Sequence, residues 1–429
     1  MLESLFKLKE RNTNAKTEIA AGITTFMTMA YILIVQPSFM KAAGMDVGAV
    51  TVVTALLSAV FSIFMGLYTN LPFALAPAMG SNAFFAFTLV AGGLATWQQG
   101  LGMTFISGII FILLTIFGLR EVIVKVIPKN VKIAIGAAIG FYIAQLGFKN
   151  GHLMLIADGS IKMGNLHDPN TLLTLIGVLI LVALMANKVK GDVLIGIILT
   201  TLIGIPMGIT KIPNSFISMP PSISPIAFQL DILGSLKWSF FPLMFTFFVG
   251  DFFSTLGTVL GVSAKAGLLD ENGDLPGINK PFLVDAIATV VGAVMGSTVV
   301  TTYIESASGV EAGGRTGLTA VSTGMCFLFT LLFTPIAAMI PAEATAPALI
   351  LIGLLMISCV KDIDFSDFTE AFPAFATIIF TTFTSSISNG ISIGIISYTL
   401  TKIVSGRIKE LNWGIFILCI PLVFYFIIM

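Results

Sequence analysis

The feature that most restricts the fold of this chain is a succession of long apolar runs from Ile19 to the C-terminus. Each run is close to the ~20 residues that a helix needs to cross a bilayer. Only 10% of the 429 residues are charged, and the mean hydropathy is +1.01, whereas soluble proteins carry about 25% charged residues. The sequence therefore predicts an all-α polytopic membrane protein.

Two of the runs differ from the others. The third and the tenth are short and rich in Gly, Pro, Ser, Thr or Asn, which is typical of broken membrane segments. The apolar runs cover residues 19–40, 47–70, 72–92, 101–119, 131–148, 172–187, 191–209, 237–261, 281–297, 298–313, 316–341, 344–360, 370–387, 389–405 and 412–428. We predict about fourteen transmembrane segments, with the last run leaving the side of the C-terminus open.

The placement of positive charge favours counting the third run as a crossing. Residues 1–18 carry four basic residues and no signal-peptide pattern, so the positive-inside rule predicts a retained, cytoplasmic N-terminal segment. The segment after the fourth run carries a second basic group, so it is also expected inside, which requires an even number of crossings between the two. The two groups are Lys7, Lys9, Arg11 and Lys16, and Arg120, Lys125, Lys129 and Lys132.

The two halves of the chain resemble each other. Residues 17–46 echo residues 238–270, and in each half a full span and then a broken segment follow. We predict two inverted repeats of seven segments, at 19–236 and 237–429, whose broken segments face each other. Matched broken segments indicate the binding site of a transporter; the alternative is a pair of proline-kinked helices with a packing role.

Each broken segment has its own means of interrupting a helix. Pro72 and Pro77 remove backbone donors in the first, and Gly80 permits close approach before a helix begins at Ser81 and Asn82. In the second, β-branched residues 299–302 predict a short extended stretch that turns into a helix near Glu305. A helix that starts at mid-membrane offers unpaired N–H groups to a ligand.

Four acids fall within the expected spans: Asp251, Asp285, Glu305 and Glu311. A carboxylate at bilayer depth costs ~2.5–3.5 kcal/mol, so a functional or paired role is the default. Glu305 lies in a broken segment, where a substrate can reach it, and Asp251 shares a helical face with Ser254. For Asp285, pairing and function are equally expected, and Glu311 is expected to pair with Arg315.

A carboxylate in such a site can do two things. It accepts hydrogen bonds from the ring N–H groups of a planar, neutral, polar ligand. It can also take a proton when the ligand is absent or arriving, and that coupling gives proton symport. Basic residues are not expected in the spans at this depth, which argues against an inorganic anion such as sulfate.

Other classes of function find little support in the sequence. Cys326, Cys359 and Cys419 lie in apolar runs, and His152 and His167 share one polar loop, so neither a metal site nor a cofactor is expected. The net charge is zero without a basic stripe, which argues against nucleic acid. No Ser-His-Asp, HExxH or Walker-like pattern occurs, so we do not expect an enzyme.

Four stretches resemble one family of transporters. They are TEIAAGITTFMTMAYILIVQP, APAMGSNAFFAF, GDFFSTLGTVLGVSAKAGLLDENGDLP and TTYIESASGVEAGGRTGLTAV, which begin at Thr17, Ala76, Gly250 and Thr301. They resemble the adenine/guanine/hypoxanthine permease branch of the nucleobase transporters (nucleobase–cation symporters), along nearly the whole chain. The resemblance implies two inverted repeats, a core and a gate domain, and proton-coupled purine uptake by an elevator-like movement of the core.

The resemblance also implies roles for single residues. Glu305 matches the family's tenth-segment glutamate, which holds the purine, and Asn82 matches the third-segment asparagine, flanked by Gly80 and Ser81. The family pattern D-x-F-D-T-x-G-T keeps its first acid here as Asp251, but Ser254 replaces the second. Ser254 or Asp251 is therefore expected to contact the base, and Ser306 and Thr302 complete the expected substrate-binding residues.

We thus expect a multi-pass permease of the cytoplasmic membrane that imports adenine, guanine or hypoxanthine with a proton. Glu305 and Asp251 are the candidates for proton coupling, and a homodimer is left open. Two alternatives remain: a xanthine- or uracil-type symporter of the same fold, and an uncoupled nucleobase facilitator.

Overall fold

The structure is a computed structural model of the whole chain, and it describes residues 2–118, 126–157, 160–213, 215–270 and 275–428. Two of the basic residues used above for orientation, Arg120 and Lys125, therefore lie outside the described residues, as does the ENGD portion of the third motif. Among the described residues, nine helices are long and apolar enough to cross a membrane, with three shorter apolar helices beside them.

In the described part of the first half, the regular elements are helices, one strand of the broken segment and one hairpin. Its elements are α1 (Leu2–Phe6), α2 (Ala15–Met29), α3 (Ile32–Ala42), α4 (Val47–Thr69), β1 (Leu75–Pro77), α5 (Met79–Ala83) with a π-helical continuation (Phe84–Val90), α6 (Trp97–Ile116), α8 (Lys129–Asn150), β2 (Met154–Ala157), β3 (Ser160–Met163), α9 (Pro169–Ala186), α10 (Asp192–Gly204) and α11 (Ile232–Ser235).

The second half also places its helices around one strand of a broken segment. Its helices and strand are α12 (Phe241–Ala266, preceded by a 3₁₀ turn at Trp238–Phe240), α13 (Asn279–Met295), β4 (Val300–Thr302), α14 (Ser306–Glu311), α15 (Gly317–Thr330), α16 (Thr334–Met339), α17 (Ala342–Ile357), α18 (Phe368–Thr384), α19 (Ile387–Val404) and α20 (Trp413–Ile428), with further 3₁₀ turns at Leu331–Phe333, Ser358–Asp362 and Ile408–Glu410.

Several helices begin where the sequence supplies a capping side chain. Asp46 accepts a hydrogen bond from the Ala49 N–H at the start of α4. Thr96 and Gln99 form a reciprocal capping box on α6. These side chains satisfy backbone donors that the first turn of a helix leaves unpaired. The first predicted run, 19–40, starts later than the helix that contains it: α2 begins at Ala15.

The two broken segments meet in the middle of the molecule. Strands β1 and β4 pair antiparallel, with Leu75 opposite Thr302 and Pro77 opposite Val300, and each strand leads into a short helix. The expected extended stretch before Glu305 is confirmed by β4. The expectation that a helix follows the prolines is confirmed as well, although α5 begins at Met79, ahead of Ser81.

Side chains complete the hydrogen bonding of these short strands. The Ser62 hydroxyl accepts from the Leu75 N–H (2.9 Å), and the Asp285 carboxylate accepts from the Thr302 N–H (2.6 Å). The Thr289 hydroxyl bonds both backbone groups of Val300. Irregular backbone at membrane depth is tolerated only where it is buried and satisfied, and these partners meet that condition.

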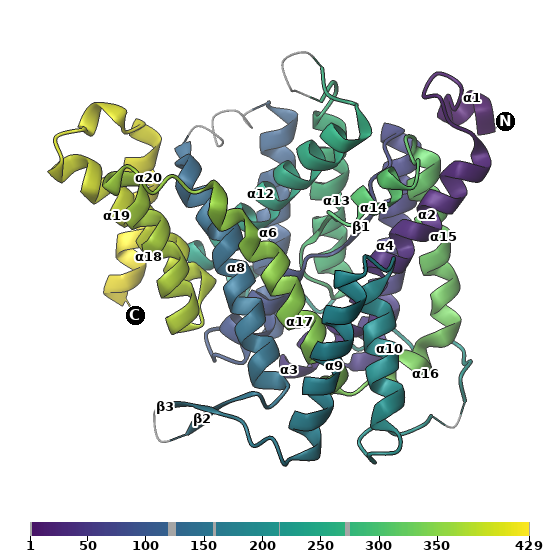
Figure 1. Cartoon of the computed structure of the whole chain (residues 1–429). Coiled ribbons are helices and arrows are strands. Elements are labelled where there is room, and N and C mark those ends of the chain that lie inside the picture. Colours follow the sequence, from purple (N-terminus) through teal and green to yellow (C-terminus); the bar gives the residue numbers. More distant parts are fainter. Residues whose placement is uncertain (1, 119–125, 158–159, 214, 271–274, 429) are drawn as a thin grey trace.

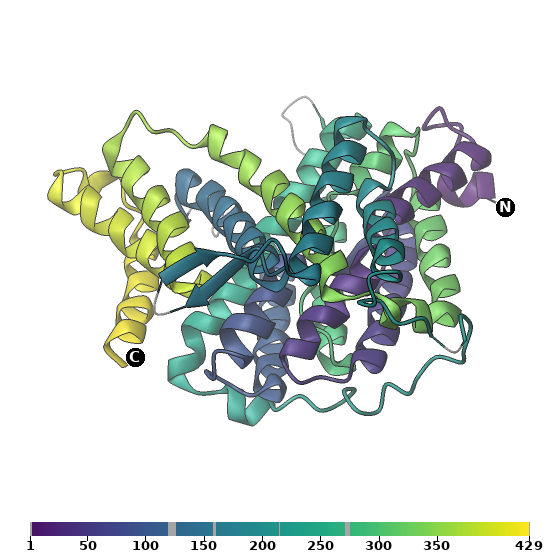
Figure 2. The ribbon, with the colours of Figure 1, turned by 60° about the horizontal axis from the view of Figure 1, so that its bottom comes forward.

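The helices pack into two groups. Group one contains α2 to α6 and α12 to α15, around the paired strands; group two contains α8, α9, α10 and α17 to α20. Helices pack densely within each group and sparsely between them. Figures 1 and 2 show α1, α2 and α15 at one side of the molecule and α18 to α20 at the other, with the two termini at opposite sides.

The packing in one half of the chain recurs in the other. In group one, α4 packs on α15 as α13 packs on α6, and α2 packs on α15 as α12 packs on α6. In group two, α8 packs on α18 as α17 packs on α9, and α9 packs on α10 as α18 packs on α19. Exchanging the two halves therefore leaves the main pattern of contacts unchanged.

The β2–β3 hairpin is an element that the sequence did not predict. It pairs Met154 with Met163 and Ala157 with Ser160, in the loop between α8 and α9 that was expected to be irregular. The Ser-Ile-Lys-Met sequence of β3 does alternate polar and apolar residues, but the pattern is only four residues long and all four are exposed.

Candidate functional site

A cavity of about 240 Å³ lies between the two helix groups. Group one contributes Tyr31 at the break between α2 and α3, residues of α5 and α12, and β4 with the residues that follow it. Group two contributes residues of α8 and α17, including Lys132, Ile139 and Met356. The cavity thus lies where one group faces the other, beside the paired strands.

Glu305 lines this cavity from the residue that precedes α14. Its Oε1 atom accepts a hydrogen bond from the Tyr31 hydroxyl, with 2.6 Å between the oxygens. Tyr31 is buried, and its ring packs within group one. One carboxylate oxygen is therefore held by a fixed donor, which orients the carboxylate as an acceptor toward the cavity.

The residues of α5 are divided between the cavity and the protein core. Gly80 and Ser81 line the cavity. Asn82 does not: it is fully buried, and its Oδ1 atom accepts a hydrogen bond from the Thr298 hydroxyl. The turn of α5 directs this side chain toward the segment before β4, so Asn82 does not line the cavity wall. Its expected role beside a ligand stays a prediction.

The two candidate residues of α12 also point in different directions. Ser254 is exposed and lines the cavity, whereas Asp251 is 1% exposed and absent from its wall. The Asp251 Oδ2 atom accepts from the Thr289 hydroxyl of α13, 2.8 Å away. Positions three apart on a helix differ by about 60° around its axis, which suffices here to place one residue in the core and the other in the cavity.

Thr302, Ser306 and Asp285 together hold the second broken segment. Thr302 lines the cavity, but its hydroxyl and its N–H both donate to the Asp285 Oδ1 atom, at 2.9 and 2.6 Å. Ser306 is buried behind the cavity, and its hydroxyl accepts from the Ala74 N–H. Pairing and function were both expected for Asp285, and in the structure Asp285 is paired with Thr302.

Lys132 overturns one expectation drawn from the sequence. The spans were expected to contain no basic residue at the depth of the site, yet Lys132 lines the cavity from the first turn of α8. Its ammonium nitrogen lies 5.4 Å from the centroid of the Phe253 ring, which also lines the cavity. The signal was present in the sequence, because Lys132 is inside the predicted run 131–148.

Two further cavity residues, Tyr31 and Phe253, were missed by sequence reasoning. Each lies in a run of apolar residues, and nothing in its local pattern separates it from residues that pack in a core. Only their position across from α8 brings them to the site.

The acid Glu311 and its expected partner Arg315 are not paired. Glu311 lies 2.7 Å from the Lys265 ammonium, and the Arg315 guanidinium donates to the Val310 and Gly314 carbonyls. The acid that holds this turn is Glu18 of α2, which is fully buried and accepts from the Arg315 N–H. The expected pair was wrong because Glu311 points away from the turn, toward the end of α12.

The cysteines and histidines bear on metal binding. Cys326, Cys359 and Cys419 are free thiols, and the His152 Nε2 atom lies 3.7 Å from Glu343. In the described parts of the chain, no three His, Cys, Asp or Glu residues gather in a way that could hold a metal ion.

Comparison with known proteins decides the family. Residues 16–393, most of the chain, match the model of a family described as the permease family. This chain belongs to that permease family. It is a membrane transporter of many spans and not an enzyme.

Curated relatives match this permease along nearly its whole length. The adenine permease AdeP of Escherichia coli (strain K12) is 43% identical over 413 residues, which are 96% of this chain and 93% of that protein. The guanine/hypoxanthine permease PbuG of Bacillus subtilis (strain 168) is 38% identical over 438 residues, 99% of each chain.

Solved structures share the fold of this permease. The transmembrane domain of the cyanobacterial bicarbonate transporter BicA superposes with a TM-score of 0.64 at 18% identity, covering 88% of this chain and 97% of that domain. At this identity, the likeness speaks for the fold alone.

Proposed function

We propose that this permease carries a purine nucleobase across the cytoplasmic membrane together with a proton. The observation that carries the proposal is Glu305, an acceptor held by Tyr31 on the wall of a cavity between two helix groups. The chain is 43% identical to an adenine permease and 38% identical to a guanine/hypoxanthine permease. Both names point to purine bases.

The cavity suits a flat, polar, neutral ring. The Glu305 carboxylate can accept ring N–H groups, while the hydroxyls of Ser81 and Ser254 can donate or accept. The Phe253 ring offers a face on which a base can stack, and stacking is favourable for any base because every base has a π-face. Apolar walls with a few convergent polar groups are typical of small-molecule sites.

For proton coupling, Glu305 is the stronger of the two candidates. Its side chain lines the cavity, so a proton can reach it when the base is absent, whereas Asp251 is buried and hydrogen-bonded to Thr289. For symport, the core must move only when the site holds both the proton and the base, so that the two cross the membrane together.

The architecture supports transport by movement of one helix group against the other. We propose that group one is the core domain, which carries the paired strands, and that group two is the gate domain. The recurrence of helix packing between the halves supports two inverted repeats of seven segments, at 19–236 and 237–429. With the N-terminal segment 1–18 in the cytoplasm, an elevator-like movement of the core would expose the site to each side in turn.

Glu305→Gln tests the proposed role of the acid. The substitution keeps the size of the side chain but replaces an acceptor oxygen by a donor amide, so accumulation of labelled hypoxanthine, guanine and adenine is expected to fall about tenfold or more. The measurement is uptake in cells that lack their own purine transporters.

The control for this variant is Glu311→Gln, the same exchange on the same segment. Glu311 is exposed and paired with Lys265, so uptake is expected to stay near that of the unaltered protein. Equal accumulation by Glu305→Gln and the unaltered protein would refute the role of Glu305. Uptake that a protonophore leaves unchanged would favour an uncoupled facilitator, and preference for xanthine or uracil in a competition panel would favour the other symporter type.

A further inference from the structure

Helices α12 and α13 each carry a buried acid on the face that they turn toward each other. Asp251 of α12 is 1% exposed, and Asp285 of α13 is fully buried. The Thr289 hydroxyl of α13 donates to the Asp251 Oδ2 atom, 2.8 Å away. In return, the Thr255 hydroxyl of α12 donates to the Asp285 Oδ2 atom, also at 2.8 Å. Because residues four apart share a helical face, this exchange brings the two carboxyl groups within hydrogen-bonding reach of each other.

The two acids are not equally supplied with donors. The Asp285 Oδ1 atom accepts from the N–H and the hydroxyl of Thr302, at 2.6 and 2.9 Å, in addition to the Thr255 hydroxyl at Oδ2. Among the described residues, no group donates to the Asp251 Oδ1 atom. The Thr301 hydroxyl lies near Asp251, but it bonds the Thr255 hydroxyl at 2.8 Å. Since Thr255 gives its own proton to Asp285, Thr301 must supply the proton of that bond.

Two ionised carboxylates would be costly in this position. The four hydrogen bonds that the acids accept all come from hydroxyl or amide donors, which are neutral. Like charges at close range disfavour ionisation of both groups, and a buried acceptor without a donor costs free energy. One proton on Asp251 removes both costs. It leaves a single charge, and it turns the Oδ1 atom into a donor for which the Asp285 carboxylate is the acceptor at hand.

Further titratable side chains face α12 from the elements packed against it, on the side of the cavity. Lys132 of α8, Tyr303 after β4 and Glu305 before α14 all line the cavity wall. Asp251 and Asp285 do not line that wall. A proton on this pair is therefore set apart from the surface that a base would touch.

We propose that Asp251 and Asp285 share one proton, which is carried by Asp251 and stays bound whether or not the cavity holds a ligand. The protonated pair joins α12 to α13, and through Thr302 it also holds β4, so it positions the second broken segment in group one. This proton is additional to the one that the proposed function assigns to Glu305. The shared proton itself does not depend on which solute the protein carries.

Infrared spectroscopy of the purified protein tests for this proton directly, because a protonated carboxyl group has a carbonyl band that a carboxylate lacks. The spectrum is recorded at pH 8 on Glu305→Gln, so that Glu305 cannot contribute. We expect a carboxylic acid band that is lost when Asp251→Asn is added to the same chain. Asp46→Asn, a helix cap far from the pair in the chain, is the matched control and should leave the band in place. In the unaltered protein, addition of hypoxanthine should also leave it in place.

Thr289→Val is a second variant, which decides the question if Asp251→Asn does not fold. It removes the hydroxyl that donates to the Asp251 Oδ2 atom, so the carbonyl band should move to higher frequency. Thr104→Val is its control, because the Thr104 hydroxyl bonds the Gly100 carbonyl within α6; the band should not move.

Four results would overturn the inference. Absence of the band in Glu305→Gln would mean that both acids are ionised, and a band that neither Asp251→Asn nor Thr289→Val alters would belong to another group. Loss of the band on addition of hypoxanthine would make the proton part of the coupling, and its loss on addition of sodium ions would replace the proton by a cation. Failure of the unaltered protein to accumulate any purine would instead overturn the proposed function, since the spectrum is recorded without transport.

Discussion

At the scale of single residues, the site depends on which side of a short element each side chain takes. Ser81 and Asn82 are neighbours in α5, yet the first lines the cavity and the second is hydrogen-bonded to Thr298 in the core. Asp251 and Ser254 are separated in the same way on α12. A substrate would therefore meet Glu305 as the carboxylate of group one.

Tyr31→Phe tests how far the carboxylate depends on its fixed donor. The change removes the 2.6 Å hydrogen bond to the Glu305 Oε1 atom and keeps the volume of the ring. Because hydrogen bonds to charged groups contribute about 1.5–3 kcal/mol, the half-saturating concentration of the base should rise about tenfold. Kinetics of labelled uptake provide the measurement.

The control for Tyr31→Phe is Tyr142→Phe. Tyr142 is also buried, and its hydroxyl bonds Thr88, 3.0 Å away, outside the cavity. The control should leave the half-saturating concentration unchanged. A similar rise in both variants would mean that Tyr31 acts through general packing and not through Glu305.

At the scale of elements, close contacts between helix backbones hold each group together. Helices α8 and α17 cross at Gly140 and Gly353, where a Cβ on Gly353 would lie 2.6 Å from the Gly140 carbonyl oxygen. Small residues at such crossings let backbones approach in membrane proteins, where packing replaces the hydrophobic effect as the driving force.

Gly353→Ala is expected to destabilise group two. The added methyl group meets backbone on α8 that cannot move alone, and overpacking of this kind costs about 1–3 kcal/mol. The melting temperature in detergent should fall. Gly257→Ala on α12 is the control, since no atom lies within 4 Å of its added Cβ; it should be neutral or slightly stabilising. Equal melting temperatures for both variants would contradict the packing argument.

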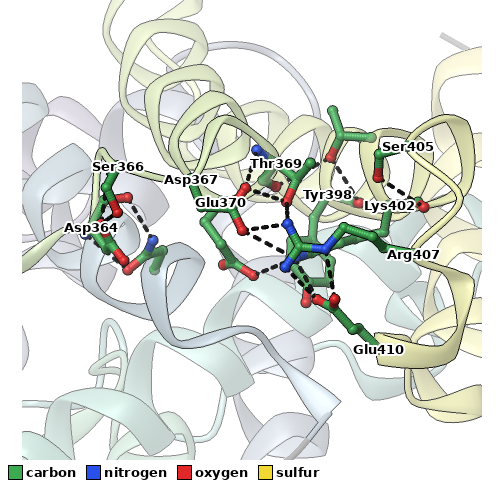
Figure 3. Close-up of polar contacts among 12 residues, drawn as sticks. Asp364, Ser366, Asp367, Thr369, Glu370, Tyr398, Lys402, Ser405, Arg407 and Glu410 are labelled. Carbon is green, nitrogen blue, oxygen red and sulfur yellow. Dashed lines mark hydrogen bonds and ion pairs between the residues drawn. The ribbon is translucent and has the colours of Figure 1, made fainter.

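A second device at this scale is a charge cluster that ties the start of α18 to the end of α19. Figure 3 shows Arg407 between Asp367 and Glu410, with Lys402 beside them. The Lys402 side chain is fully buried and lies 3.0 Å from Glu370 and 2.8 Å from Glu410. The acids of this cluster pair with the Lys402 ammonium, which would otherwise be a buried charge without a partner.

The cluster makes a prediction about pH. Hydrogen bonds from Thr369 and then from Arg407 lower the pKa of the Asp367 carboxyl from its ordinary 3.8 to about 2. A lowered folded pKa stabilises the protein above pH ~4, and this contribution is lost as the pH falls from there toward 2. Asp367→Asn should therefore lower the melting temperature by the same amount at pH 6 and at pH 8. Below pH 4, the difference in melting temperature between the variant and the unaltered protein should become smaller.

Asp46→Asn is the matched control for the pH series. Asp46 also caps a helix, and Asn is an equally good cap, so this variant isolates the capping role from the ion pair with Arg407. If Asp367→Asn lowers the melting temperature no more than Asp46→Asn does, the ion pair with Arg407 makes no measurable contribution to stability. Many exposed ion pairs behave in that way.

At the scale of the whole molecule, the cavity lies on the boundary where the two helix groups touch sparsely. Gly80 of group one faces Ile139 of group two, and a Cβ on Gly80 would lie 2.6 Å from the Ile139 Cγ2 atom. If the groups slide past each other during transport, Ile139 must move past position 80, and the absence of a side chain at Gly80 leaves room for this movement.

Gly80→Ala should therefore slow transport more than it lowers stability. The added methyl group blocks the boundary, and the maximal rate of uptake is expected to fall several-fold while the melting temperature changes little. Adding Ile139→Ala in the same chain removes the opposing methyl groups and should restore much of the rate. No recovery in the double variant would place the effect of Gly80 within α5 rather than between the groups.

Much of this organisation could be predicted from the sequence. Apolar runs of bilayer length predicted the helices, since burial in lipid requires them to be apolar along their length. Prolines 72 and 77 and the β-branched residues 299–302 marked the two broken segments, because they disfavour helix by local sterics. Glu305 stood out because a carboxylate at that depth is costly without a role.

The tertiary structure alone decided which polar residues meet. Lys132, Tyr31 and Phe253 reach the cavity from three segments far apart in the chain, and no local pattern encodes that meeting. Asn82, Asp251 and Ser306 lie in the core, although residues one to three positions away from each of them line the cavity. Composition and periodicity reflect the surrounding solvent and the local conformation of the chain. A binding site depends instead on contacts between segments far apart in sequence. The sequence thus determined a broken-helix membrane protein with an acid at its centre, and the packing of two helix groups determined what that acid faces.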